Sequence, residues 1–240
     1  MKTLYIAAAC LHLVSRFVFA QQPMAFPNST FSCENTLKYH IYFAGIKTGW
    51  LTRKEAWSET GGSISSNSYA GILGIGTRFE QHASFVWDEQ KGFVTTEFTQ
   101  DVSGFKNREM TVDIAEGGHQ SVMLVNQKEM QFTNPDRPIL DVDTISAQLR
   151  YMLLQGVEQF QLTRQASDML EHYHYFVEQQ QTKNYSKWGE LKVIPIKQKG
   201  ADEVTMWFAP SMDYQLVDAK YHSMLLPGSM KLVDRVKTCD

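Results

Sequence analysis

The chain has 240 residues, of which 43% are hydrophobic, 12% aromatic and 20% charged, and its formal net charge is −3. Such a composition is typical of one globular domain, or at most two small ones, with enough apolar side chains for a core. It excludes a disordered chain, a coiled coil and a multi-pass membrane protein. The near balance of charges, without a basic cluster, predicts no nucleic-acid partner.

The first twenty residues have the pattern of a secretory signal peptide. Lys2 supplies the positive start, the apolar stretch Leu4–Val14 follows, and small residues stand at Val18 and Ala20, where signal peptidase requires them. We therefore expect cleavage after Ala20 (signal peptide 1–20) and export to the periplasm. A membrane anchor is the alternative, but Leu4–Val14 is well short of the roughly 20 residues that cross a bilayer. A lipoprotein signal ending at Cys10 is a second alternative.

No later segment is long and apolar enough to span a membrane, so we do not expect an integral membrane protein. Two cysteines remain after cleavage, Cys33 and Cys239, near the two ends of the mature chain. In an oxidising compartment an even pair usually forms a disulfide. Closing a loop of about 200 residues stabilises the fold by roughly 5 kcal/mol at most in the chain-entropy description. Two free thiols are the alternative.

The mature chain begins with a polar stretch and continues with alternating patterns. Residues 21–32 contain two prolines and are predicted as a flexible leader, so that 33–240 form a single β-rich domain. Residues 37–43 and 79–87 alternate apolar and polar side chains, and a turn at Ala44-Gly45 leads from the first into a strand over 46–57. Further strands are predicted at 93–102, 106–115, 121–125, 129–132, 159–164, 171–180, 185–197, 204–208, 214–224 and 229–236.

One segment has the period of a helix instead. Between Asp141 and Gly156, apolar residues recur at i, i+4, i+7 and i+8, which predicts a helix over about 143–155. Asp143 or Thr144 is suited to cap its start, and Gly156 suits the left-handed position after its end. The apolar stripe consists of Ile145, Leu149, Met152 and Leu153.

The order of four motifs resembles a known family. YHIYFAGIKTG is similar to its opening hairpin, DTISAQLRYMLLQG to its central helix, WGELKVIPI to a later strand, and TMWFAPSMDYQLVDAKY to its closing Trp-x-x-Pro-x-x-Asp-Tyr stretch. The family is the exported Gram-negative domain of unknown function 3108. Gln215-Leu216 departs from its usual Leu-Pro. The resemblance implies an antiparallel, barrel-like envelope protein and brings no established reaction.

Two groups of residues have the chemistry of a site. His172 and His174 share one face of a predicted strand, and a third ligand from Glu171, His222 or His82 would complete a metal site. The favoured interpretation is two partly exposed histidines opposite Tyr173 and Tyr175, so no metal or other cofactor is predicted.

The second group, Asp141, Asp143 and Ser146, offers acid, base and hydroxyl groups, as an unrecognised hydrolase would need. Capping of the helix is the simpler interpretation, because carboxylates stabilise a helix N-terminus and no Gly-x-Ser-x-Gly sequence is present. The glycine-rich GILGIG at 71–76 is interpreted as a strand or turn rather than a phosphate loop. The five tryptophans would suit stacking on sugars or lining a cavity, but are interpreted as core: Trp50, Trp57, Trp87, Trp188 and Trp207.

The predicted fold is mainly β, an antiparallel barrel or strongly curved sheet with one central helix packed on it or across its mouth. The predicted function is non-catalytic binding of an apolar or amphiphilic ligand, lipid-like or glycan-linked, in the periplasm, since a barrel of this size can enclose a ligand. In this hypothesis the apolar stripe of the helix (Ile145, Leu149, Met152 and Leu153) forms a lid over the ligand. The alternatives are a scaffold that docks another envelope protein, and the hydrolase.

Overall fold

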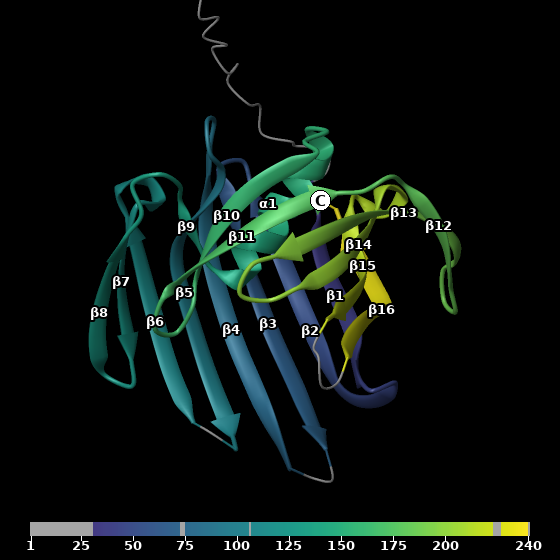
Figure 1. Cartoon of the computed structure of the whole chain (residues 1–240), viewed down its shortest axis with the longest axis horizontal. Helices are drawn as coiled ribbons and strands as arrows, with labels where there is room; N and C mark the ends of the chain where they lie inside the picture. The colour runs from purple at the N-terminus through teal and green to yellow at the C-terminus, as the bar shows by residue number, and fades with distance from the viewer. Residues whose placement is uncertain (1–30, 73–74, 106, 223–226, 240) are drawn as a thin grey trace, which may run out of the picture.

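One strongly curved sheet of sixteen strands makes up most of the computed structural model (Figure 1). The structure describes residues 31–72, 75–105, 107–222 and 227–239, so the predicted signal peptide and residues 21–30 of the leader lie outside it. The strands are β1 (Glu34–Phe43), β2 (Ile46–Ser58), β3 (Gly61–Ile72), β4 (Ile75–Asp88), β5 (Gly92–Gly104), β6 (Arg108–Ala115), β7 (Gln120–Val125), β8 (Lys128–Thr133), β9 (Ile139–Leu140), β10 (Gln159–Gln165), β11 (Leu170–Val177), β12 (Gln181–Tyr185), β13 (Gly189–Lys199), β14 (Val204–Ala209), β15 (Gln215–Tyr221) and β16 (Gly228–Thr238). The helix α1 (Val142–Leu154) and two 3₁₀ turns, η1 (Glu116–Gly118) and η2 (Pro210–Met212), complete the described elements.

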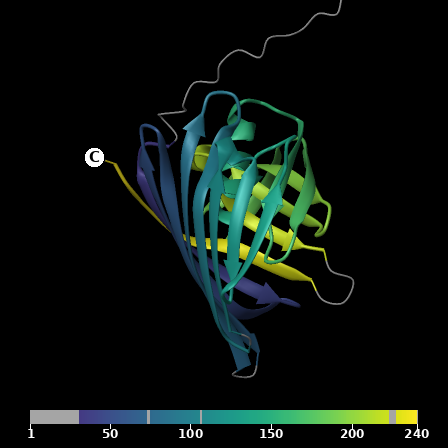
Figure 2. The same ribbon diagram turned by 90° about the vertical axis from the view of Figure 1, so that its left-hand side faces the viewer.

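The strands form a meander in which the first strand, β1, pairs with the last strand, β16. Strands β8 to β1 follow one another in reverse order, β1 then pairs with β16, and the order continues through β15, β14, β13, β11, β10 and β9. The short β9–β10 pair is parallel and the other pairs are antiparallel. Figure 2 shows the N-terminal strands (purple to blue) facing the C-terminal strands (green to yellow). The prediction of a curved antiparallel sheet with one helix is confirmed.

Side chains connect the two ends of this strand order. The register contains no pairing between β8 and β9 in the part of the chain that the structure describes. Instead, the Ser121 hydroxyl donates to the side-chain oxygen of Gln165 (2.7 Å), and the Asn134 amide donates to the Thr163 hydroxyl (2.9 Å). The molecule is therefore barrel-like without a complete ring of backbone hydrogen bonds.

Three strands were not predicted from the sequence. Strand β3 reads GGSISSNSYAGI, a composition of small polar residues that is unfavourable for strands, yet it pairs along its length with β2 and β4. Pairing with both neighbours gives hydrogen-bond partners to the backbone N–H and C=O groups of β3, so the propensity of its side chains does not decide its conformation. The two-residue β9 was also missed, and the strand predicted over 171–180 ends at Val177, with β12 as a separate strand. Of the glycine-rich motif, residues 71–72 end β3 and residues 75–76 begin β4, and Gly71 pairs with Gly76.

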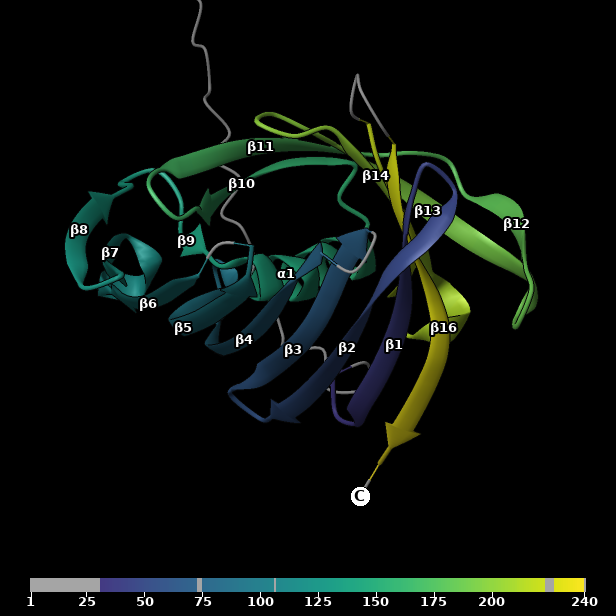
Figure 3. The ribbon, with the colours of Figure 1, turned by 90° about the horizontal axis from the view of Figure 1, so that it is seen from below.

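Helix α1 lies inside the curve of the sheet (Figure 3). It begins one residue before the predicted start, and Asp141 is its N-cap, accepting hydrogen bonds from the amides of Asp143 (2.7 Å) and Thr144 (3.0 Å). Gly156 has a φ of +67°, the left-handed conformation predicted from its position.

Both faces of α1 are covered. Ile145, Leu149 and Leu153 pack in one cluster with residues of β9, β10, β11, β13 and β14: Leu140, Leu162, Tyr173, Tyr175, Ile196 and Phe208. The other face packs in a second cluster with residues that precede β1 or belong to β3, β4 and β5: Phe31, Ile64, Phe85 and Phe93. Met152 is partly buried in that second cluster. The sequence predicted one buried stripe, whereas the enclosing sheet buries the helix on two sides.

The ends of the described chain are fixed beside this core. Cys33 and Cys239 form a disulfide, with their Cα atoms 4.4 Å apart. Phe31 is 1% exposed and packs edge-on against Trp57 (ring centroids 4.5 Å apart) and Phe93 (5.0 Å). The packed core therefore includes Phe31, two residues before the disulfide. No described helix is long and apolar enough to cross a membrane.

Leu149→Ala is expected to lower the free energy of unfolding by about 2–5 kcal/mol, because the side chain is 1% exposed and its truncation leaves a cavity. Leu124→Ala is the matched control, since Leu124 is 43% exposed on β7, and it should cost less than about 1 kcal/mol. Urea unfolding measures both values. Equal costs for the two variants would contradict the buried position of α1.

Candidate functional site

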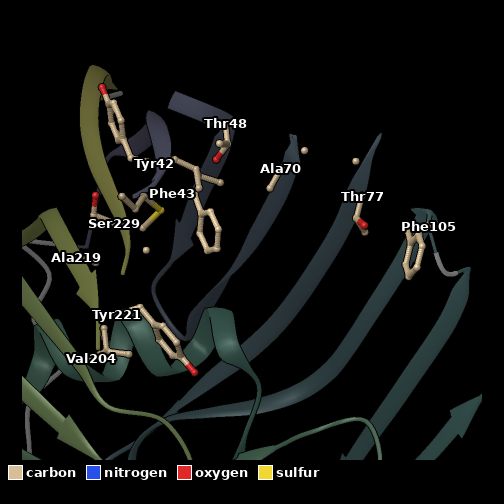
Figure 4. Close-up of a pocket in the computed structure, with 15 residues that line it drawn as sticks. Tyr42, Phe43, Thr48, Ala70, Thr77, Phe105, Val204, Ala219, Tyr221 and Ser229 are labelled. Carbon is tan, nitrogen blue, oxygen red and sulfur yellow. The ribbon is translucent and has the colours of Figure 1, made fainter. Parts of the chain in front are cut away.

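An apolar cavity of about 750 Å³ lies at the end of the sheet where β1 ends and β16 begins (Figure 4). Its volume is within the range of ligand pockets in proteins, roughly 300–1,000 Å³. The apolar part of its wall consists of Ile41, Phe43, Ala70, Phe105, Val204, Ala219 and Met230, and hydroxyl groups come from Tyr42, Thr48, Thr77, Tyr221 and Ser229. None of the described residues that line it carries a charge.

Strand alternation and small residues together produce this cavity. Ile41 and Phe43 continue the inward face of β1 that begins with Leu37 and Tyr39 in the core. The register with β2 shifts between Ile41 and Tyr42, so that Tyr42 also lines the cavity. Several other lining residues have little or no side chain: Ala70, Gly71, Gly76, Ala219 and Gly228.

Met230 connects this cavity to the buried interior. It also lines a small internal space of about 30 Å³, together with Leu51, Leu216 and several charged side chains. That second space is lined by Arg53, Glu55 and Arg150 as well as by Ser146 of α1. The apolar cavity thus lies next to a buried polar centre, with Met230 shared between them.

The polar centre is a chain of four alternating charges. Arg53 of β2 donates from Nη1 to Asp143 Oδ1 (2.6 Å) and from Nη2 to the Asp143 carbonyl (2.9 Å) and the Ser146 hydroxyl. Its Nε donates to Glu55 Oε1 (3.3 Å), and Arg150 Nη1 donates to Glu55 Oε2 (2.9 Å). All four charged residues are at most 8% exposed. These bonds hold α1 against β2.

Further contacts connect the polar centre to β15 and to Phe31, which precedes β1. The Gln215 amide donates to Glu55 Oε2 (2.8 Å), and the Arg150 guanidinium donates to the Asp213 carbonyl (3.1 Å from Nη2). The guanidinium carbon of Arg150 also lies 4.6 Å from the ring centroid of Phe31. Strand β2, helix α1, the residues before β1 and strand β15 are therefore tied together by one ion network.

The two buried carboxyls of this network differ in pKa. Burial alone would raise the pKa of Glu55, but the guanidinium groups of Arg150 and Arg53 and the hydrogen bond from Gln215 hold it below its usual value. For Asp143 burial dominates and raises the pKa to about 6, although Arg53 opposes this shift. The neighbouring Asp141 carboxylate adds to the increase. Asp143 Oδ2 has no hydrogen-bond partner among the described residues.

The group predicted as helix cap or hydrolase site belongs to this network. Asp141 caps α1 and also accepts from the hydroxyl of Thr95 (2.7 Å), while Asp143 and Ser146 are bound by Arg53. Among the described residues, no histidine donates to or accepts from any of the three. Of the three, Asp141 caps the helix, so the prediction of Asp143 or Thr144 as the cap was wrong, and Asp143 and Ser146 bind Arg53 instead.

The other candidates from the sequence lie elsewhere. His172 and His174 are exposed on β11, opposite the buried Tyr173 and Tyr175, and each has its Nδ1 within hydrogen-bond distance of a β10 side chain. The described residues contain no group of three or more His, Cys, Asp or Glu side chains arranged to hold a metal ion. The tryptophans do not line the apolar cavity: Trp57, Trp87, Trp188 and Trp207 are packed against core clusters, and Trp50 is 37% exposed.

The four helix residues predicted as a lid pack in the core, and none of them lines the apolar cavity in the described structure. These contacts give the lid no support, so it stays a prediction and is not part of the function proposed below. The cavity-lining residues at the hairpin ends were not predicted; the signal in the sequence was the combination of inward-facing Ile41 and Phe43 with small residues at 70–71, 76 and 228.

No family model and no curated protein matches this chain in sequence. Among solved structures, its fold is similar to a β-barrel-like protein of domain of unknown function DUF1849 from Brucella abortus. The TM-score is 0.60, the identity 10%, and the match covers 86% of this chain and 98% of that chain. At this identity the likeness shows the fold alone. The resemblance to the domain of unknown function 3108 family stays a prediction.

Asp143→Asn is expected to change stability in a pH-dependent way. The pKa of Asp143 rises from 3.8 to about 6 on burial, so between these values the folded chain holds a proton that the unfolded chain releases. Stability contributed by this group is present below about pH 4 and is lost as the pH rises through about 6. The free energy of unfolding of the variant, relative to that of the wild type, should therefore rise by up to about 3 kcal/mol between about pH 4.5 and 6.5.

Urea unfolding of the wild type and the variant at about pH 4.5 and at about pH 6.5 measures this change in relative stability. Asp113→Asn, at an exposed position on β6, is the matched control for the loss of one carboxylate. A stability difference between wild type and Asp143→Asn that stays constant across the window would contradict protonation of Asp143 in this range.

Proposed function

We propose that this chain is an exported protein of the periplasm that binds an apolar or amphiphilic molecule, lipid-like or glycan-linked, and catalyses no reaction. The observation that carries the proposal is the cavity of about 750 Å³ with an uncharged, mostly apolar wall. Burying an alkyl chain there is favourable by about 25 cal/mol for each Å² removed from water. The hydroxyl groups of Tyr42, Thr77 and Ser229 are available to the polar part of an amphiphile.

The cavity favours binding over the scaffold interpretation, which expects a filled interior. Export is supported by two independent features, the signal-peptide pattern of residues 1–20 and the disulfide between Cys33 and Cys239. The polar centre beside the cavity supports the binding proposal indirectly, because it holds α1 in one part of the interior and leaves the other part open.

Ala219→Phe is expected to weaken ligand binding at least about tenfold, equivalent to about 1.4 kcal/mol, because its ring would occupy the cavity that Ala219 lines. The measurement is fluorescence of 1-N-phenylnaphthylamine bound to the protein and its displacement by palmitate. Ala115→Phe, the same change at an exposed position on β6, should leave binding unchanged. Absence of dye binding to the wild type, or equal binding by both variants, would contradict the proposal.

N-terminal sequencing of protein released from the periplasm tests the export part of the proposal. The first residue should be Gln21, because Val18 and Ala20 meet the requirement of signal peptidase for small residues. Recovery of a chain that begins at Met1 would disprove the cleavage. In the released protein, peptide mapping without reductant should recover Cys33 joined to Cys239.

A further inference from the structure

The mouth of the apolar cavity carries two strongly exposed apolar side chains. Phe105, which follows β5 and lines the cavity, is 76% exposed, and Ile46, the first residue of β2 and the register partner of the lining residue Phe43, is 70% exposed. No other large apolar side chain in the described parts of the chain is as exposed as these two. Single exposed apolar residues are normal on soluble proteins, but the start of β2 and the end of β5, where these two residues stand, lie at the same end of the sheet (Figure 1).

The hairpin ends around this mouth are also cationic, although the whole chain has a net charge of −3. Their described residues include five basic side chains, and the sequence ranges 41–49, 69–79, 102–108 and 219–231 contain no Asp or Glu. The five are Lys47, Arg78, Arg108, Lys220 and Lys231. None of them forms an ion pair with another described residue.

Carboxylates also lie near this end of the sheet. In the connection between β13 and β14, Asp202 accepts from the Tyr221 hydroxyl (2.8 Å) and lies 3.7 Å from Arg164 Nη2, and the exposed Glu203 precedes the lining residue Val204. Glu80 and Glu109, which lie within two residues of Arg78 and Arg108, each pair in register with Asp101. The outermost residues of the hairpins at this end are therefore apolar and basic, and the carboxylates lie further along the strands or in the β13–β14 connection.

We propose that this end of the protein docks on an anionic lipid surface, with Ile46 and Phe105 inserted at the boundary between headgroups and acyl chains. Apolar tips supply the burial and Lys47 and Lys231 supply attraction to lipid phosphates, which is the combination that interfacial segments use. Docking in this orientation places the cavity mouth against the membrane, so an amphiphile passes between bilayer and cavity without crossing water. The inference rests on the proposed binding function and identifies the membrane as the source or destination of the ligand.

Vesicle flotation of the whole mature protein tests the docking. Vesicles of phosphatidylethanolamine with phosphatidylglycerol should bind the wild type, and vesicles of phosphatidylcholine alone should bind it at least about tenfold more weakly. Ile46→Ser/Phe105→Ser should reduce binding to the anionic vesicles about tenfold or more. Lys47→Gln/Lys231→Gln should remove most of the preference for anionic lipid and its dependence on salt.

The matched control is Val86→Ser/Val236→Ser, which removes two apolar side chains that are 44% and 54% exposed. Both lie near the C-terminal ends of their strands, β4 and β16, whereas the cavity is at the N-terminal ends of these strands. This control should float like the wild type. Ile46→Ser alone, which changes no residue of the cavity wall, should also float more weakly than the wild type, and it should still bind 1-N-phenylnaphthylamine in the absence of vesicles, which shows that it folds with its cavity intact.

Equal flotation of the Ile46→Ser/Phe105→Ser variant and the wild type would overturn the docking proposal. So would binding to native envelope membranes without binding to protein-free vesicles, because the partner would then be a protein. Dye and palmitate binding by a wild type that does not float would overturn docking and leave the proposed function intact. Flotation without any dye or palmitate binding would overturn the proposed function, and with it the transfer of a ligand.

Discussion

A buried chain of alternating charges, Asp143–Arg53–Glu55–Arg150, determines where the helix lies inside the sheet. Two members belong to β2 and two to α1, and all are at most 8% exposed. Removing one partner of such a pair costs about 3–5 kcal/mol, because an unpaired charge stays buried. The helix therefore cannot slide along the interior without breaking bonds that water does not replace, and the Asp213 carbonyl and Gln215 amide tie β15 to the same position.

This constraint divides the interior into two parts. A helix of 13 residues is about 20 Å long and fills only part of the curved sheet. Around it, Phe31, the disulfide and the two core clusters make a closely packed end. At the other end, the same inward faces of the strands continue with Ile41, Phe43 and Met230 but meet small residues, and the apolar cavity remains. The packed end accounts for stability, and the open end accounts for the proposed binding and for docking on lipid.

Local patterns in the sequence predicted most of the fold but not the polar centre. The alternation in β1 and the period and ends of α1 are properties of neighbouring residues, and the structure follows them closely. Arg53 pairs with Asp143 across 90 positions and Arg150 with Glu55 across 95, distances that no local period reveals. A signal was nevertheless present, because Arg53 and Glu55 alternate on the same strand face as Leu51 and Trp57. Charges on an apolar strand face predict a buried partner.

The central claim is that the open end of the interior, and not the helix end, receives an apolar ligand. A crystal structure of the protein with a fatty acid brominated on its alkyl chain tests this most directly, because anomalous scattering locates the bromine atoms. We expect bromine peaks inside the cavity, between Phe43, Ala219 and Met230. Peaks confined to the outer surface of the sheet, or located among the side chains around α1, would contradict it.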